Sequence, residues 1–172
     1  LIFLMSVFMS CKSPKPTDSG FMKKAVPVLA EGREKEMNLN LGFHGIFHKD
    51  ESRNIKLKIT ASPLYRVFLN GEFLGYGPAR AAHGFSRIDE YDVSNKAKNG
   101  ENIIAIEVAG YNVNSYYTID EPSFLLAEVE SDGKILLATG AEPGFKAFQI
   151  KERLQKVERY SFQRPFTEYY RL

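Results

Sequence analysis

The sequence predicts an all-β protein built as an antiparallel β-sandwich or jelly roll. From about residue 38 onward, apolar residues recur with a period close to two, the spacing of side chains on one face of a strand. Turn residues interrupt this pattern at short intervals, and helical periodicity is rare. About nine short strands without helices between them favour a sandwich over a parallel α/β fold. The 172 residues suffice for one domain with its own core.

The expected strands follow from apolar alternation and from turn residues. Asn70-Gly71 separates two alternating runs and predicts a β-hairpin, because both residues tolerate the positive φ of a type I′ turn. Strands are predicted at residues 41–48, 55–61, 64–69, 72–76, 103–108, 124–129 and 135–138, with weaker candidates at 145–150 and 157–162 and a weak helical pattern at 151–159.

Composition excludes several classes of function. The chain has 23 Lys and Arg against 21 Asp and Glu, so a net charge of +2 gives no field that would favour nucleic acid as a partner. The sequence contains no G-x-S-x-G elbow, no P-loop and no G-x-G-x-x-G motif, and we expect no cofactor. Tyr and Phe are abundant but Trp is absent, which weighs against a free-standing lectin.

The first ten residues are almost wholly apolar and end before Cys11. Ten residues cannot span a bilayer, so this segment is typical of a signal peptide that lacks its basic start. The run VFMSC resembles a bacterial lipoprotein signal, which implies lipid attachment at Cys11; an ordinary signal peptide is the alternative. We expect a signal peptide at 1–10, a tether at 11–36, and an exported protein whose lipid holds it on the membrane of the cell envelope, in the periplasm or on the outer surface.

Several motifs together carry a family resemblance. YRVFLNGEFLG at 65–75, YDV at 91–93 and NGENIIAI at 99–106 resemble β-sandwich modules attached to glycoside hydrolases. GPAR at 77–80 and YSFQRPF at 160–166 look most like the N-terminal region of bacterial α-L-rhamnosidase-like proteins. The resemblance covers residues 38–172 and implies a galactose-binding-like jelly roll. These motifs indicate a fold and not a chemistry, and the GEN turn also suits a structural role that satisfies backbone groups.

The resemblance implies that hydrolysis takes place in a separate helical barrel with its own acid and base, and this chain resembles no such barrel. Acidic residues do gather at positions 89, 90 and 92 and at 120–121, but a catalytic pair must lie about 5 to 9.5 Å apart. Solvated acidic loops are much commoner, so we expect no catalytic residue here. His44 and His48 on one strand would lie about 13 Å apart, too far for one metal ion, and no metal site is expected.

Two stretches rich in aromatic and polar residues are candidates for carbohydrate binding. Aromatic rings pack against sugar C–H groups, while amide and guanidinium groups pair with hydroxyls. The alternative is that the rings pack across a domain interface and the asparagines cap turns. The candidates are Tyr76, Arg80 and His83 in the first stretch, and Tyr111, Asn112, Asn114, Tyr116 and Tyr117 in the second.

These patterns predict a β-sandwich at residues 37–163 and the start of a linker to a further domain at 164–172, where the aromatic segment RPFTEYYRL carries no turn signal. The expected function is that of a non-catalytic module of an exported α-L-rhamnosidase-like glycoside hydrolase. It would bind carbohydrate, such as rhamnose-containing glycans, or support the catalytic domain of the same protein. The alternatives are a stand-alone cell-surface glycan-binding lipoprotein and, less favoured by the acidic residues, a small complete hydrolase.

Overall fold

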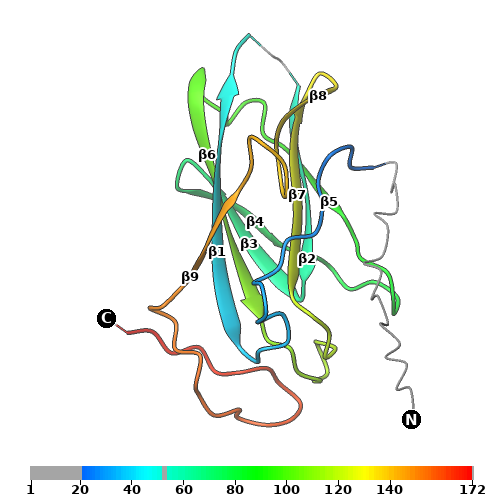
Figure 1. Cartoon of the computed structure of the whole chain (residues 1–172), viewed down its shortest axis with the longest axis vertical. Helices are drawn as coiled ribbons and strands as arrows, with labels where there is room; N and C mark the ends of the chain where they lie inside the picture. The colour runs from blue at the N-terminus through cyan, green and yellow to red at the C-terminus, as the bar shows by residue number, and fades with distance from the viewer. Residues whose placement is uncertain (1–20, 52–53, 172) are drawn as a thin grey trace, which may run out of the picture.

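The computed structural model describes residues 21–51 and 54–171. The predicted signal peptide and Cys11 lie outside these residues. The described part is a sandwich of two antiparallel sheets packed face to face (Figure 1) and contains no helix. No helix able to cross a membrane is therefore found within the described ranges. The prediction of an all-β antiparallel sandwich is confirmed.

Nine strands form the two sheets of the described part. The five-stranded sheet has the order β4-β3-β6-β1-β9, and the four-stranded sheet has the order β5-β2-β7-β8. All neighbouring strands pair antiparallel. The strands are β1 (Leu39–Lys49), β2 (Ile55–Ser62), β3 (Leu64–Leu69), β4 (Glu72–Gly77), β5 (Asp89–Asp92), β6 (Gly100–Gly110), β7 (Phe124–Ser131), β8 (Lys134–Ala138) and β9 (Lys146–Gln149).

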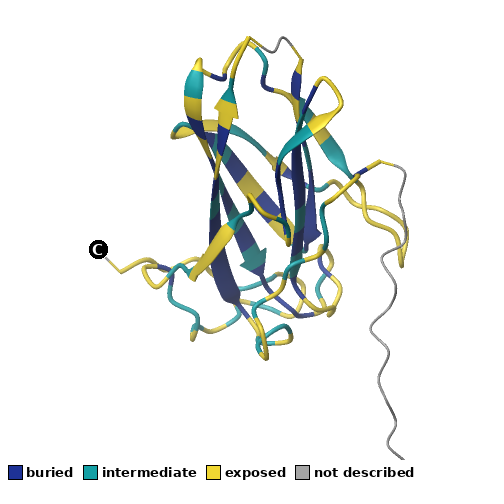
Figure 2. Cartoon of the chain, turned by 45° about the horizontal axis from the view of Figure 1, so that its top comes forward, coloured by how far each residue is buried: buried dark blue, intermediate teal, exposed yellow. Residues whose placement is uncertain are grey.

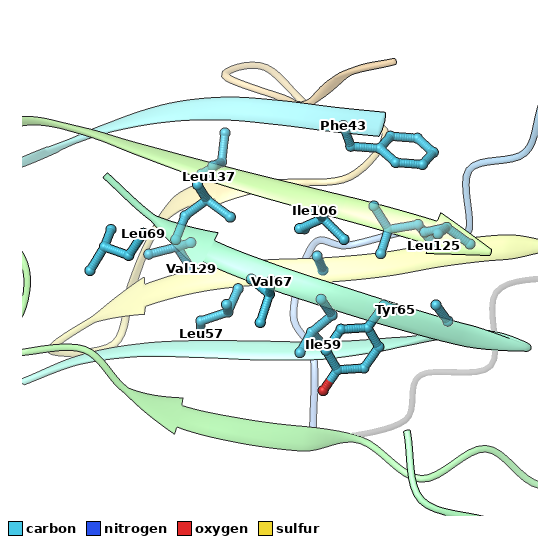
Figure 3. Close-up of a cluster of buried hydrophobic side chains, with 14 of the residues drawn as sticks. Phe43, Leu57, Ile59, Tyr65, Val67, Leu69, Ile106, Leu125, Val129 and Leu137 are labelled. Atoms are coloured by element: carbon cyan, nitrogen blue, oxygen red, sulfur yellow. The ribbon is translucent and has the colours of Figure 1, made fainter. Parts of the chain in front are cut away.

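The core lies between the sheets, where alternate residues of each long strand face inward. Val67 and Ile106 of the five-stranded sheet meet Leu57 and Val129 of the other sheet, and all four are buried (Figure 3). Figure 2 shows the burial concentrated in the middle of the strands and the exposure in the loops at both ends. Side chains that are exposed for binding are therefore found mainly on the loops and on the outer faces of the sheets.

The predicted hairpin connects β3 and β4, and its turn contacts the GEN turn. Asn70 and Gly71 have φ values of 52° and 84°, in the left-handed region that a type I′ turn requires. Nδ2 of Asn70 donates to Oδ1 of the fully buried Asn102, at 2.9 Å. Oδ1 of Asn102 also accepts a hydrogen bond from the backbone N–H of Lys98, and Nδ2 of Asn102 donates one to the carbonyl oxygen of Lys98. The two motifs therefore form one hydrogen-bonded unit with a structural role.

Residues 150–171 differ from the prediction. They form neither the strand expected at 157–162 nor a helix at 151–159, and run as irregular chain below one end of the sandwich, drawn orange to red in Figure 1. An isolated bridge between Arg153 and Tyr170 closes this segment on itself. Its apolar residues are too few for a continuous strand face, and side chains of the sandwich hold it in place instead.

The described part of the predicted tether, residues 21–36, packs on the four-stranded sheet. The carboxylate of the fully buried Glu128 accepts the backbone N–H groups of Lys23, Lys24 and Ala25 at 2.6 to 3.1 Å. Val28 then forms a bridge with Leu125 on β7. This segment shows no apolar period, and hydrogen bonds hold it against the sheet. The boundary expected at residue 36 stays a prediction.

Candidate functional site

Two long loops leave the same end of the sandwich. Strands β4 and β6 are both antiparallel to β3 and therefore run in the same direction. The loop that follows β4, residues 78–88, and the loop that follows β6, residues 111–123, consequently lie at one end. The short turn from β2 to β3 is at this end too, since it precedes the start of β3.

These loops enclose a depression of about 320 Å³. It brings together four of the residues predicted from the sequence, namely Arg80, His83, Tyr116 and Tyr117, although more than thirty positions separate the two pairs. We call this site the loop depression. Its wall consists of residues 78–87 on one side and 115–119 on the other, with Ala61, Pro63, Leu64 and Glu121 between them.

Arg80 joins the two sides of the loop depression. Its guanidinium carbon lies 5.2 Å from the ring centre of Tyr117, within the range of a cation–π contact. Its Nη2 also donates to the backbone carbonyl oxygen of Tyr116. The side chains of Tyr116 and Tyr117 remain 64% and 62% exposed, so much of each ring is open to a ligand.

A network around Ser115 fixes the backbone that carries the two tyrosines. Oγ of Ser115 accepts the N–H groups of Tyr117 and Thr118, both at 3.0 Å. The hydroxyl of Thr118, which is buried, donates to the carbonyl oxygen of Val113 at 2.7 Å. Ser and Thr stabilise turns in this way because their hydroxyls satisfy nearby backbone groups. The tyrosines therefore stand on an ordered turn.

Charged groups of both signs line the loop depression. Glu121 accepts a hydrogen bond from Ser62 at 2.7 Å, and Arg87, which sequence reasoning missed, forms an ion pair of 3.4 Å with Asp89. Only its position beside the GPAR segment could have drawn attention to Arg87. With Arg80 and His83, the depression offers several hydrogen-bond donors beside two open rings. This chemistry suits hydroxyl-rich ligands.

The two predicted asparagines have structural partners. Asn112 is only 3% exposed; its Nδ2 donates to the carbonyl oxygens of Glu34 and Glu36, and its Oδ1 accepts from Ser123. These bonds occupy the Asn112 amide, so turn capping replaces the expected ligand contact. Oδ1 of Asn114 accepts the N–H of residue 120 in the same loop. Neither asparagine lines the loop depression.

Tyr76 and Tyr111 lie apart from the loop depression. Both line a separate cavity that reaches the outer face of the five-stranded sheet. Tyr111 is buried, with its hydroxyl accepting from Nη2 of Arg153 at 3.2 Å, whereas Tyr76 is 77% exposed. The candidates between residues 76 and 83 fall into two places, because Tyr76 belongs to β4 and lies on the outer face of the sheet while Arg80 belongs to the loop that follows.

The acidic residues around β5 also have partners within the described ranges. Glu90 forms an ion pair of 2.7 Å with Lys56. The carboxylate of Asp92 accepts hydrogen bonds from the hydroxyl and the backbone N–H of Ser94, and these bonds lower the pKa of Asp92. His44 and His48 are placed on β1 as expected, with the His44 ring 6.0 Å from that of Phe148. No group of three or more His, Cys, Asp or Glu in the described part could hold a metal ion.

Comparisons with known proteins give structural neighbours only. No protein-family model matches the sequence, and neither does any curated protein. The GH78 family rhamnosidase of Bacillus sp. GL1 is similar to this chain with a TM-score of 0.77 and 29% identity, over 86% of this chain and 16% of that one. Two further α-L-rhamnosidases share the fold. The Aspergillus terreus enzyme has a TM-score of 0.53 and 22% identity, over 73% of this chain and 16% of that one. The Streptomyces avermitilis enzyme has a TM-score of 0.51 and 22% identity, over 76% of this chain and 15% of that one.

The described residues form an antiparallel β-sandwich module, and loops at one end of it form an open depression. More particularly, this sandwich resembles the β-sandwich part of α-L-rhamnosidases, and the prediction of that resemblance is confirmed. The chain spans only 16% of the Bacillus rhamnosidase, so the similarity concerns one module of that enzyme.

Proposed function

We propose that this chain is a non-catalytic β-sandwich module of an exported α-L-rhamnosidase-like glycoside hydrolase and contacts carbohydrate at the loop depression. The observation that carries the proposal is the stacking of Arg80 on Tyr117 beside the open ring of Tyr116. The similarity to the Bacillus rhamnosidase supports it, because the matched region is a small part of that enzyme.

The loop depression suits the surface of a sugar. A pyranose ring presents C–H groups to an aromatic face and hydroxyls to charged side chains. Tyr116 and Tyr117 supply the faces, and Arg80 supplies donors beside them. Because the site is wide and open to solvent, we expect weak binding, with a Kd on the order of 1 mM, equivalent to about −4 kcal/mol. A longer glycan would gain affinity by covering both rings.

The surface beside the loop depression suits contact with a catalytic domain of the same protein. The backbone N–H of Tyr116 donates to the carbonyl oxygen of Gln163 at 3.1 Å, and Arg159 donates to that of Asn114 at 2.9 Å. The loop and the segment at 159–164 thus form one surface, which exposes Tyr160 and neighbouring aromatic residues. Exposed aromatic groups of this kind are typical of protein interfaces. We propose a supporting role for this surface.

A titration tests carbohydrate contact. Rhamnose-containing oligosaccharides should give saturable heat in calorimetry with the whole chain, and Tyr117→Ala should weaken this binding about tenfold. Tyr169→Ala is the matched control, since Tyr169 is exposed and does not line the loop depression, and it should leave the affinity unchanged. Absence of any saturable signal would remove carbohydrate contact from the proposal and leave the supporting role.

An activity assay tests the non-catalytic role. The purified chain should release no sugar from an aryl α-L-rhamnoside. Release that is lost in Asp89→Asn or Asp120→Asn would overturn this part of the proposal.

Export with a lipid on Cys11 is a separate proposal that rests on the apolar leader. Expression in a bacterium from the natural gene, with a labelled fatty acid in the medium, should label the protein. The variant Cys11→Ser should lose the label, and equal labelling of both proteins would contradict lipid attachment at this residue.

A further inference from the structure

A second cavity, of about 250 Å³, lies away from the loop depression. We call it the sheet cavity. It has only Leu64 in common with the loop depression. Its wall combines the outer face of the five-stranded sheet with the irregular segment after β9, and includes Asn40, Arg66, Tyr76, Glu107, Arg153 and Glu168.

Strand register places the sheet residues of this wall side by side. Tyr76 on β4 is opposite Arg66 on β3, and Arg66 is opposite Glu107 on β6. Asn40 on β1 is opposite Ala109, two positions further along β6. Neighbours of these residues along β1, β3 and β6 belong to the buried core, so alternation points the wall residues to the outer face. Four strands thus contribute to one polar surface.

The charges of the sheet cavity cancel. Arg66 forms an ion pair of 2.7 Å with Glu107, and the buried Arg153 forms one of 3.1 Å with Glu168. Nη2 of Arg66 also donates to the hydroxyl of Tyr170 at 3.3 Å. The wall therefore presents hydrogen-bond donors and acceptors together and has no net charge from these four residues. Such a wall favours a ligand whose groups can both donate and accept.

Asn40 retains an unused acceptor in this wall. The residue is 3% exposed, and its Nδ2 donates to the carbonyl oxygen of Asn38 at 3.0 Å. Among the described residues, its Oδ1 has no hydrogen-bond partner. A buried acceptor without a donor costs free energy, and most such groups in proteins are paired. A hydroxyl that reached Asn40 would remove this cost.

We propose that the sheet cavity binds a single neutral sugar ring. Hydroxyls of such a ring donate and accept, as the paired charges and Asn40 require, and the exposed ring of Tyr76 offers an aromatic face at the rim. The volume lies below the range of roughly 300–1,000 Å³ found for larger ligands, which fits one ring and not a chain. Cancelled charges give an anionic sugar no advantage. This inference stands independently of the loop depression.

Backbone amide shifts of the whole isotope-labelled chain, titrated with L-rhamnose or D-glucose, test the proposal. At least one of these sugars should give saturable shifts around residues 40, 66 and 107, and the anionic D-glucuronate should bind more weakly than the better neutral sugar. Tyr76→Ala should raise the Kd about tenfold; because Tyr76 is largely exposed, this variant should keep the fold. Asn40→Leu, of similar size, should also weaken binding.

Controls separate this site from the loop depression. Tyr117→Ala should leave the shifts at the sheet cavity unchanged, because Tyr117 does not line it. The proposal would be overturned if neither neutral sugar shifted these residues at tens of millimolar, if glucuronate bound as tightly, or if Tyr76→Ala or Asn40→Leu kept the original affinity. Shifts confined to residues 115–119 would overturn it while supporting carbohydrate contact at the loop depression.

Discussion

The hydroxyl of Tyr65 donates a hydrogen bond to Oδ2 of Asp89 at 2.7 Å and so joins the two sheets. Tyr65 belongs to β3 of the five-stranded sheet, and Asp89 begins β5 of the other. The hydroxyl of Tyr91 lies 3.0 Å from that of Tyr65. A side chain on Gly77 would clash with Oδ2 of Asp89 and with the hydroxyl of Tyr65. Because β4 ends at Gly77 and β5 starts at Asp89, this cluster fixes both ends of the first loop of the depression.

Tyr65→Phe should destabilise the sandwich. The change removes a partly buried hydrogen bond to a carboxyl group and leaves Asp89 without that donor, which costs about 1–3 kcal/mol. Urea unfolding followed by circular dichroism measures this free energy. Tyr160→Phe, at an exposed ring, should change it by less than about 0.5 kcal/mol. Equal stability of the two variants would show that the hydroxyl of Tyr65 does not bind the sheets together.

Alkaline pH should weaken the fold in part through Tyr65. Burial, with the hydrogen bonds to Tyr91 and Asp89, raises the pKa of Tyr65 well above its ordinary value near 10. The folded state therefore keeps the phenol protonated, whereas the unfolded state ionises above about pH 10. Stability should hold below pH 10 and fall as the pH rises further. Melting curves between pH 8 and 11 should show a smaller alkaline decline for Tyr65→Phe than for the original chain; parallel declines would contradict this assignment.

Glu128→Ala should release residues 21–28 from the four-stranded sheet. The substitution removes the acceptor of three backbone N–H groups, each left without its partner, and we expect a loss of about 1–3 kcal/mol. Hydrogen exchange should quicken at residues 23–25 more than at β6. Exposed Glu72 provides a matched control, since Glu72→Ala should alter neither measurement. Unchanged protection at 23–25 would exclude Glu128 as the anchor of this segment.

The sequence predicts those parts of the fold that depend on local chemistry. The hairpin at Asn70-Gly71 follows from the positive φ that both residues tolerate, and the long strands follow from alternation. The packing of residues 21–36 escapes prediction because it depends on Glu128, an acidic residue that alternation places on the outer, solvent side of β7. Only the structure shows that backbone amides of a distant segment cover its carboxylate.

The sequence predicts several residues of the candidate site, but not how they are brought together. Loop composition identifies Arg80 and Tyr117, but their contact depends on β4 and β6 running in the same direction, which local patterns do not reveal. Tyr76 is close to Arg80 in sequence and belongs to another cavity, because the pleat turns it to the outer face of the sheet. Residue type therefore indicates which chemistry is present, and topology decides which groups act together.

Asn112→Ala should lower the stability of the fold, whereas Tyr117→Ala should lower the affinity for carbohydrate. Asn112 is buried, and its loss leaves the carbonyl oxygens of Glu34 and Glu36 and the hydroxyl of Ser123 without partners, at a cost of about 1–3 kcal/mol of stability. Tyr117 is exposed, so its loss should leave stability nearly unchanged and weaken binding of rhamnose-containing oligosaccharides. Thermal melting and calorimetric titration of both variants measure the two effects. If Asn112→Ala lowered the affinity of the folded protein as much as Tyr117→Ala while leaving stability intact, Asn112 would be a ligand contact and not a turn cap.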